Sequence, residues 1–237
     1  MMISARDWAN YANRLSKLSS TASQQALAYI QQHGVDDVGA FYEFATALAG
    51  KYGEGAAAIA CDMYDAIAAL QGMILPAAAP AQMPTLEEIT NVIGRALETA
   101  PSTAPAEIGK LVKKSATRTM RKNAARDGAK MALIASGDGC PYCKMIASRG
   151  WSDARSDSSF EAHLHGNCRC EYAVRFNDKL GVEGYDPEGI KKEFADTGAS
   201  GWKDRIKIVR RQYREDNKDK INAQKRVAYA RKKETDN

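Results

Sequence analysis

Residues 139–143 of the chain read Gly-Cys-Pro-Tyr-Cys, and residues 163–170 read His-Leu-His-Gly-Asn-Cys-Arg-Cys. Four of the five cysteines and two of the three histidines lie in this stretch. Thiolate and imidazole are ligands that zinc and similar divalent metals prefer. The stretch from Cys140 to Cys170 therefore predicts a metal-binding module, and the rest of the chain flanks it.

The spacing of these residues is typical of a zinc site. A C-x2-C pair on a turn offers two thiolates to one ion, and a second pair about twenty residues later completes a tetrahedron. We expect zinc to be held by Cys140, Cys143, His165 and one or both of Cys168 and Cys170, with His163 in reserve. A site with four protein ligands is closed and structural, and it would contribute about 10 kcal/mol or more to folding in place of a hydrophobic core.

Other interpretations of the same residues stay open. The thiols could be unstructured, the C-x2-C pair could be a redox centre, although its βαβ context is missing, or a cysteine could be a nucleophile with a histidine base. His163 and His165 with Asn167 also fit a metal-dependent nuclease of the HNH type, which needs an open coordination position. Cys61, in an alanine-rich segment, is expected to be a small buried residue.

Composition and charge limit the class of protein. The 237 residues are 44% hydrophobic, mostly through alanine, which favours a mainly helical fold. The sequence has neither an apolar run of about 18 residues nor a signal peptide near Met1, so we expect a cytoplasmic protein that does not enter a membrane. In the cytoplasm, clustered cysteines are more often metal ligands than disulfides.

The two parts of the chain differ in charge. Residues 1–109 contain five Lys and Arg against eleven Asp and Glu, a net charge of −6, whereas residues 110–237 contain 29 against 18, a net charge of +11. The basic part is therefore expected to meet phosphate groups or another acidic surface. A solvated helix face is the simpler alternative.

Apolar periodicity and capping residues predict the helices. We expect one or two helices over Ser4–His33 and short strands near Cys168–Phe176. Single helices are expected over Val38–Ala49, Gly55–Met73, Thr85–Thr99, Ala106–Ala135, Glu188–Phe194 and Trp202–Lys233. Pro76, Pro80 and Pro84 indicate a linker between the third and fourth helices.

Two of these helices are basic and are the candidate surfaces for nucleic acid. Ala106–Ala135 carries eight Lys and Arg residues, and Trp202–Lys233 carries thirteen against four acids. Few aromatic residues lie among them, which favours contact with phosphates and not base stacking. The candidate contact residues are Lys113, Lys114, Arg118, Arg121, Lys122, Arg210, Arg211 and Arg214.

The predicted organisation is a mainly α protein with a helical N-terminal body, a small zinc-stapled α+β module and a C-terminal basic helix or arm. Its segments are a helical region over 1–75, a Pro/Ala-rich linker with a short helix over 76–105, and a basic helix over 106–136. The Cys/His module follows over 137–180 and the basic arm over 181–237.

The motif also resembles that of a known family. The order of Gly139–Cys143, then Ala147–Gly150, then His165–Cys170 is similar to the signature of minor head (head morphogenesis) proteins of tailed bacteriophages, the Mu F-like group. About thirty residues carry this resemblance. It implies a structural virion component inside the head near the portal, present in few copies, which acts in assembly or in DNA packaging and ejection.

The combined prediction is a non-enzymatic phage head protein with a structural zinc site. Its expected partners are the portal or major capsid protein and packaged DNA, with several copies in the virion and a passage through the host cytoplasm during assembly. The HNH-like nuclease is the alternative from another class. A sequence-specific zinc-finger regulator is a third possibility, but no helix is suitably placed to read a DNA groove.

Overall fold

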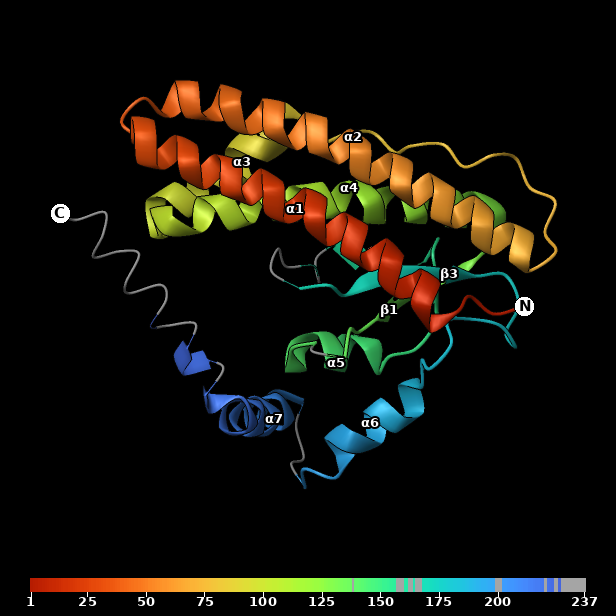
Figure 1. Cartoon of the computed structure of the whole chain (residues 1–237). Helices are drawn as coiled ribbons and strands as arrows, with labels where there is room; N and C mark the ends of the chain where they lie inside the picture. The colour runs from red at the N-terminus through yellow and green to blue at the C-terminus, as the bar shows by residue number, and fades with distance from the viewer. Residues whose placement is uncertain are drawn as a thin grey trace.

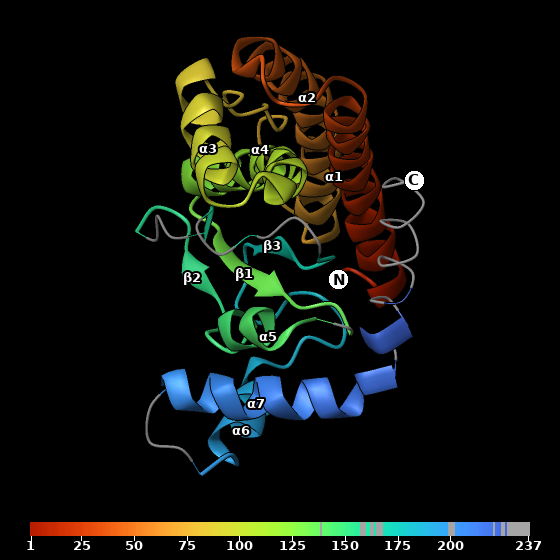
Figure 2. The same ribbon diagram turned by 90° about the vertical axis from the view of Figure 1, so that its left-hand side faces the viewer.

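The computed structural model describes residues 1–137, 139–156, 160–161, 164, 168–198, 202–219, 221–223 and 226. The fold is mainly helical, as predicted. Helices α1 (Ala5–His33) and α2 (Val38–Leu70) form a long hairpin, α4 (Ala104–Asp127) packs against both, and α3 (Leu86–Thr99) lies beside α4 (Figure 1). These helices cover one face of a small sheet (Figure 2).

The ends of α1 follow from local chemistry. The side chain of Ser4 accepts a hydrogen bond from the backbone N–H of Asp7, and Gly34 ends the helix at a φ of 71°. Of the one or two helices predicted over Ser4–His33, the structure has one.

The prediction of two separate helices over Val38–Ala49 and Gly55–Met73 is wrong, because α2 runs through the glycines between them. Gly53 is buried where α2 meets α4, and a Cβ atom there would lie 2.9 Å from Ser115 Oγ. The glycine thus allows close packing of two helices and does not break α2.

Residues 71–85, which we call the strap, connect α2 to α3 and contain the three prolines of the predicted linker. The strap is bound to α4 by hydrogen bonds. Asn123 donates to Ala79 O at 2.9 Å and accepts from Ala79 N at 3.0 Å, and Thr119 Oγ1 accepts from Ala81 N at 3.1 Å. Thr85 then caps α3, which confirms the predicted helix over Thr85–Thr99.

The prediction of one helix from Ala106 to Ala135 is too long. Helix α4 ends at Asp127, followed by Gly128 in the left-handed conformation at a φ of 69°, and the chain turns into β1 (Lys130–Ile134). The apolar residues Met131 and Ile134 belong to this strand and not to the helix.

The described residues form a three-stranded antiparallel sheet in the order β2-β1-β3. Strand β1 pairs with β2 (Ser152–Asp153) on one side and with β3 (Glu171–Arg175) on the other, in a register that places Ala132 opposite Ala173. The prediction of a strand near Cys168–Phe176 is confirmed. Helix α5 (Pro141–Ala147) covers the face of the sheet that the helix bundle leaves free (Figure 2).

The C-terminal elements lie beyond α5. Helix α6 (Pro187–Ala195) confirms the short predicted helix, and α7 (Trp202–Asp216) begins where the basic helix was expected. Most of that helix after residue 219 lies outside the described residues. The N-terminus lies beside the segment that leads into α6, because Ile3 forms a parallel bridge with Val182.

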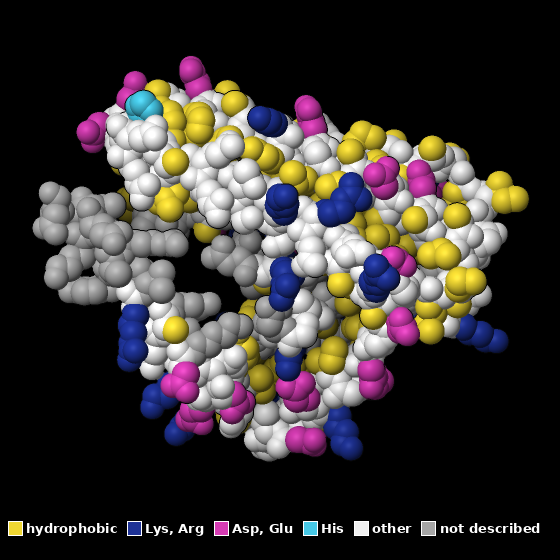
Figure 3. All heavy atoms as spheres, viewed as in Figure 1, with side chains coloured by type: hydrophobic (Ala, Val, Ile, Leu, Met, Phe, Trp, Pro, Cys, Tyr) yellow, Lys and Arg dark blue, Asp and Glu magenta, His cyan; other side chains and the backbone are white. Residues whose placement is uncertain are grey.

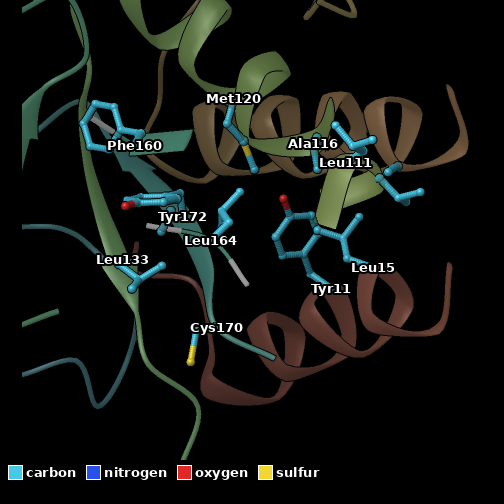
Figure 4. Packing of buried hydrophobic residues seen from close by; sticks show 14 of the residues in the cluster. Tyr11, Leu15, Leu111, Ala116, Met120, Leu133, Phe160, Leu164, Cys170 and Tyr172 are labelled. Carbon is cyan, nitrogen blue, oxygen red and sulfur yellow. The ribbon is translucent and has the colours of Figure 1, made fainter. Parts of the chain in front are cut away.

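The core is continuous between the helices and the sheet. Tyr11 and Leu15 of α1, Leu111 and Met120 of α4, and Tyr172 of β3 meet in one layer (Figure 4). Leu164 and Cys170 from the cysteine segment join the same core. The expectation that a metal would replace a hydrophobic core here is therefore wrong, since the module shares the core of the bundle.

Candidate metal centre

Three cysteine thiols converge at the point where α5 meets the approach to β3. Cys143 lies in the first turn of α5, whereas Cys168 and Cys170 immediately precede β3. The three sulfur atoms all lie within 4.8 Å of one another, and the Cys143 and Cys168 sulfurs are 3.8 Å apart. Cys143 and Cys170 are buried, with 1% and 0% of their surfaces exposed.

These distances fit a metal site. A disulfide would bring two sulfurs to about 2.0 Å, so the pair at 3.8 Å is not bonded. Two thiolates on one tetrahedral zinc, each about 2.3 Å from the ion, would lie roughly 3.8 Å apart. The cluster of Cys143, Cys168 and Cys170 could therefore hold a metal ion.

The other predicted ligands are placed as follows. Cys140 is the residue before α5 and hydrogen-bonds to Cys143, next to the three-thiol cluster but not within it. His165, the reserve ligand His163, and Asn167 of the nuclease alternative lie outside the described residues. The nuclease interpretation thus stays a prediction. Cys61 is half-buried on α2, and not fully buried as expected.

Burial and the neighbouring thiols raise the pKa of two of the clustered cysteines. Hydrogen bonds with Cys140 and then with Cys168 and Cys170, together with burial, raise the pKa of the Cys143 thiol far above its ordinary value. For Cys170, the hydrogen bond with Cys143 acts to lower the pKa, but Cys168 and burial outweigh it and raise the pKa to about 11. A bound divalent cation would reverse this balance by stabilising the thiolates.

Two further groups contact the sulfurs, and the sequence prediction missed both roles. The backbone N–H of Ser136 donates to Cys170 Sγ at 3.3 Å. The Lys113 ammonium lies 3.6 Å from Cys168 Sγ and pairs with Glu171 Oε1 at 2.9 Å. Donors to sulfur of this kind orient ligands in metal–thiolate sites.

The prediction that Lys113 contacts nucleic acid is wrong, because its side chain is 0% exposed. A signal for this burial exists in the sequence. Lys113 lies at helical spacing from Gly109, Ala116 and Met120, so it falls within the buried stripe of α4 and not on its polar face.

Four other basic residues of α4 also have partners within the protein. Arg118 makes two hydrogen bonds to Glu88, at 2.6 and 2.8 Å, and one to Glu161 at 2.6 Å. Lys114 pairs with Glu88 at 3.4 Å. Arg121 donates to Ala154 O at 3.3 Å, and the exposed Lys122 donates to Pro80 O at 2.9 Å. None of these four residues is fully buried, so their contact with nucleic acid stays a prediction.

Most basic residues of α7 are exposed. Arg210, Arg211 and Arg214 are exposed, and with Lys207 and Lys218 they line a shallow hollow in the surface. Figure 3 shows Lys and Arg side chains around α7 at the lower left, beside acidic ones. One acid, Glu215, lies in the hollow, and it pairs with Arg211 at 3.2 Å.

The fold and the cysteine cluster define a mainly helical protein with a small sheet and a largely buried group of thiols that could hold a metal ion. The chain belongs to the VG15 protein family, whose model matches residues 2–197, and it is thus a phage protein. None of the curated proteins and none of the solved structures compared with the chain matches it. Among the described residues, no helix is both long enough and apolar enough to cross a membrane.

Proposed function

We propose that this protein is a non-enzymatic structural component of a tailed-phage head, bound inside the head near the portal in several copies. Membership of a phage family supports the phage part of the proposal. The resemblance of Cys140–Cys170 to minor head proteins supports the location. The buried thiol cluster supports a structural, and not a catalytic, use of the metal.

The observation that carries the structural interpretation is the burial of Cys143 and Cys170 in the common core, beside the half-buried Cys168. Cys170 is fully buried, and the neighbouring Tyr172 packs against Phe160 with ring centroids 5.0 Å apart. A catalytic metal needs an open coordination position that a substrate can reach, whereas a structural metal is enclosed by protein ligands. Zinc suits this site because it prefers thiolate and imidazole in a tetrahedral arrangement.

The metal is tested by its stoichiometry and by its effect on stability. We expect the purified protein to contain one zinc ion per chain, and removal of the ion by a chelator to lower the midpoint of thermal unfolding. Cys143→Ser should abolish stoichiometric zinc binding, because it removes the central thiol of the cluster. Cys61→Ser is the matched control, since Cys61 lies on α2 outside the cluster, and it should keep the metal. A folded wild-type protein that takes up no zinc would contradict the proposal.

The DNA part of the proposal rests on α7. Four cations of α7, with Lys218 just beyond it, line one hollow, and phosphate contacts by Lys and Arg carry no base specificity. Binding to duplex DNA is therefore expected to be independent of sequence and to weaken steeply as salt is added. Salt-insensitive binding, or none at low salt, would remove this part and leave the metal site unaffected.

The position in the virion is tested by locating the protein in purified particles. Cross-linking within intact heads followed by mass spectrometry should join this chain to the portal or the major capsid protein. Joining to tail proteins alone would contradict the proposal.

A further inference from the structure

Lys113 is a buried cation directed from α4 at the loop that carries two of the clustered thiols. Its ammonium donates to Cys168 O at 2.8 Å and Cys170 O at 3.1 Å, pairs with Glu171 at 2.9 Å, and lies 3.6 Å from Cys168 Sγ. The side chain is 0% exposed. All of these contacts are made to three residues, 168, 170 and 171.

A lysine in this place is costly for the fold alone. Desolvation of an ammonium and a carboxylate offsets most of their mutual attraction, and apolar side chains of similar size often replace such pairs without loss of stability. The neighbouring positions of the stripe, Gly109, Ala116 and Met120, are small or apolar. The contacts of Lys113 with Cys168 and Cys170 indicate that its charge acts on the cysteine segment.

The geometry of a C-x-C sequence explains the two carbonyl contacts. In an extended chain, side chains two residues apart point to the same face, and their carbonyl groups point to the same edge. The ammonium of Lys113 binds both carbonyls, of Cys168 and Cys170, at one edge. This contact fixes the backbone that directs both sulfurs toward Cys143.

Charge gives Lys113 a second effect. A divalent ion with three or four thiolates has a net negative charge, and in a buried site that charge needs a nearby cation or hydrogen-bond donors. Lys113 offers its ammonium to the Cys168 sulfur, and Ser136 offers its N–H to the Cys170 sulfur.

We propose that Lys113 is a positioning residue of the metal centre, which fixes the backbone of Cys168–Cys170 and compensates the charge of the thiolates. It would make metal affinity depend on the packing of α4 against the cysteine segment. This inference rests on the metal site in the proposed function. Under this inference, α4 of the helical bundle takes part in metal binding, which the cysteine motif alone would not predict.

The test compares metal affinity in variants that differ only at Lys113. Because removing Lys113 alone would strand a buried carboxylate, the pair compared is E171Q and K113M/E171Q, each with its helix content checked by circular dichroism. Cobalt(II) is the probe, since thiolate-to-cobalt absorption reports both the affinity and the number of thiolates bound. Outer-sphere partners change metal affinity by about 10- to 100-fold. We expect K113M/E171Q to bind cobalt about 10- to 100-fold more weakly than E171Q and to show a weaker thiolate-to-cobalt absorption.

K122M is the control, because Lys122 lies on the same helix and donates to the strap at Pro80. It should bind cobalt as the wild type does. Equal cobalt affinity of E171Q and K113M/E171Q would overturn the inference while leaving the metal site intact. The inference would also be overturned if, in the absence of cobalt, E171Q is folded but K113M/E171Q is unfolded. Lys113 would then serve the fold alone. A wild-type chain that binds no cobalt would instead overturn the proposed metal site.

Discussion

Helices α4 and α7 are both rich in Lys and Arg, yet the protein uses their charges in opposite ways. In α4 the cations contact the cysteine segment, the strap and α3. In α7 most of them are exposed, and two pair locally, Lys207 with Asp204 at 3.0 Å and Arg211 with Glu215 at 3.2 Å. One helix holds the fold together through its charges, whereas the other presents them to solvent.

The difference comes from the apolar residues between the charges. Helix α4 buries more than half of its length, including Ile108, Leu111 and Met120, and lies between α1, α2 and the sheet. Among the described side chains of α7, only Ile206 is fully buried. A basic side chain on a central helix must find acceptors inside the protein, because water cannot solvate it there. Net charge alone therefore does not identify a nucleic-acid surface.

The largest contrast between the two helices is expected on loss of one lysine from each. Lys113→Ala leaves the buried carboxylate of Glu171 and two carbonyls without their cation, and breaking a buried pair costs about 3–5 kcal/mol. Lys207→Ala removes an exposed pair and should cost less than about 0.5 kcal/mol. Urea unfolding of the two variants measures both free energies. Equal losses would remove the distinction between the helices.

A smaller effect is expected for Arg118, which joins α3 to the segment at Glu161. Its three charged hydrogen bonds are partly exposed, so Arg118→Ala should lower the free energy of unfolding by about 1.5–3 kcal/mol. Arg211→Ala on α7 is the matched control and should change it by less than about 0.5 kcal/mol. A loss in Arg118→Ala no larger than in the control would show that these bonds add nothing.

The same substitution should change the dependence of stability on pH. Burial acts to raise the pKa of Glu88, but hydrogen bonds from Arg118 and the charge of Lys114 outweigh it and lower that pKa. The stability from this group is therefore present above the unfolded value of about 4.3 and is lost as the pH falls through the lower folded value. The gap between wild type and Arg118→Ala should be wide near pH 6 and narrow below about pH 4. A constant gap would contradict the assignment.

Much of this architecture could be predicted from local signals, and the failures have physical causes. Ser4, Gly34 and Thr85 identified helix ends correctly because capping is a local interaction. Gly53 was misread because its reason, close contact with Ser115, lies far away in the sequence. Lys113 was misread for the same reason, since its acceptors are 55 to 58 residues away. Long-range contacts decide what a local pattern cannot.

The strap offers the next smaller effect. Asn123 is buried and satisfies both the N–H and the carbonyl of Ala79, so Asn123→Ala leaves two backbone groups without their partner. We expect a loss of about 1–2 kcal/mol in urea unfolding. Gln212→Ala on α7 also removes an amide, one that pairs with Asp216 within the same exposed helix, and should cost almost nothing. Similar losses in both variants would contradict a structural role for the strap contacts.

The smallest effect on stability, and the largest on DNA, is expected for the exposed face of α7. R210A/R211A/R214A removes three exposed cations that line one hollow, so the free energy of unfolding should stay within about 0.5 kcal/mol of wild type. Each lost phosphate contact should reduce the slope of log affinity against log salt by about 0.9, or about 2.7 for all three.

The control must change the net charge equally without touching α7. R6A/R14A/K17A does this, because all three residues are exposed on α1. If DNA binding depends on α7 itself, the slope of log affinity against log salt should fall only in the α7 variant and stay unchanged in the control. If both triple variants weaken binding equally, the attraction comes from overall charge, and no surface of the protein is specialised for DNA. If both triple variants keep full DNA binding, neither α7 nor α1 is the site of phosphate contact. The comparison of α4 with α7 would then concern stability alone.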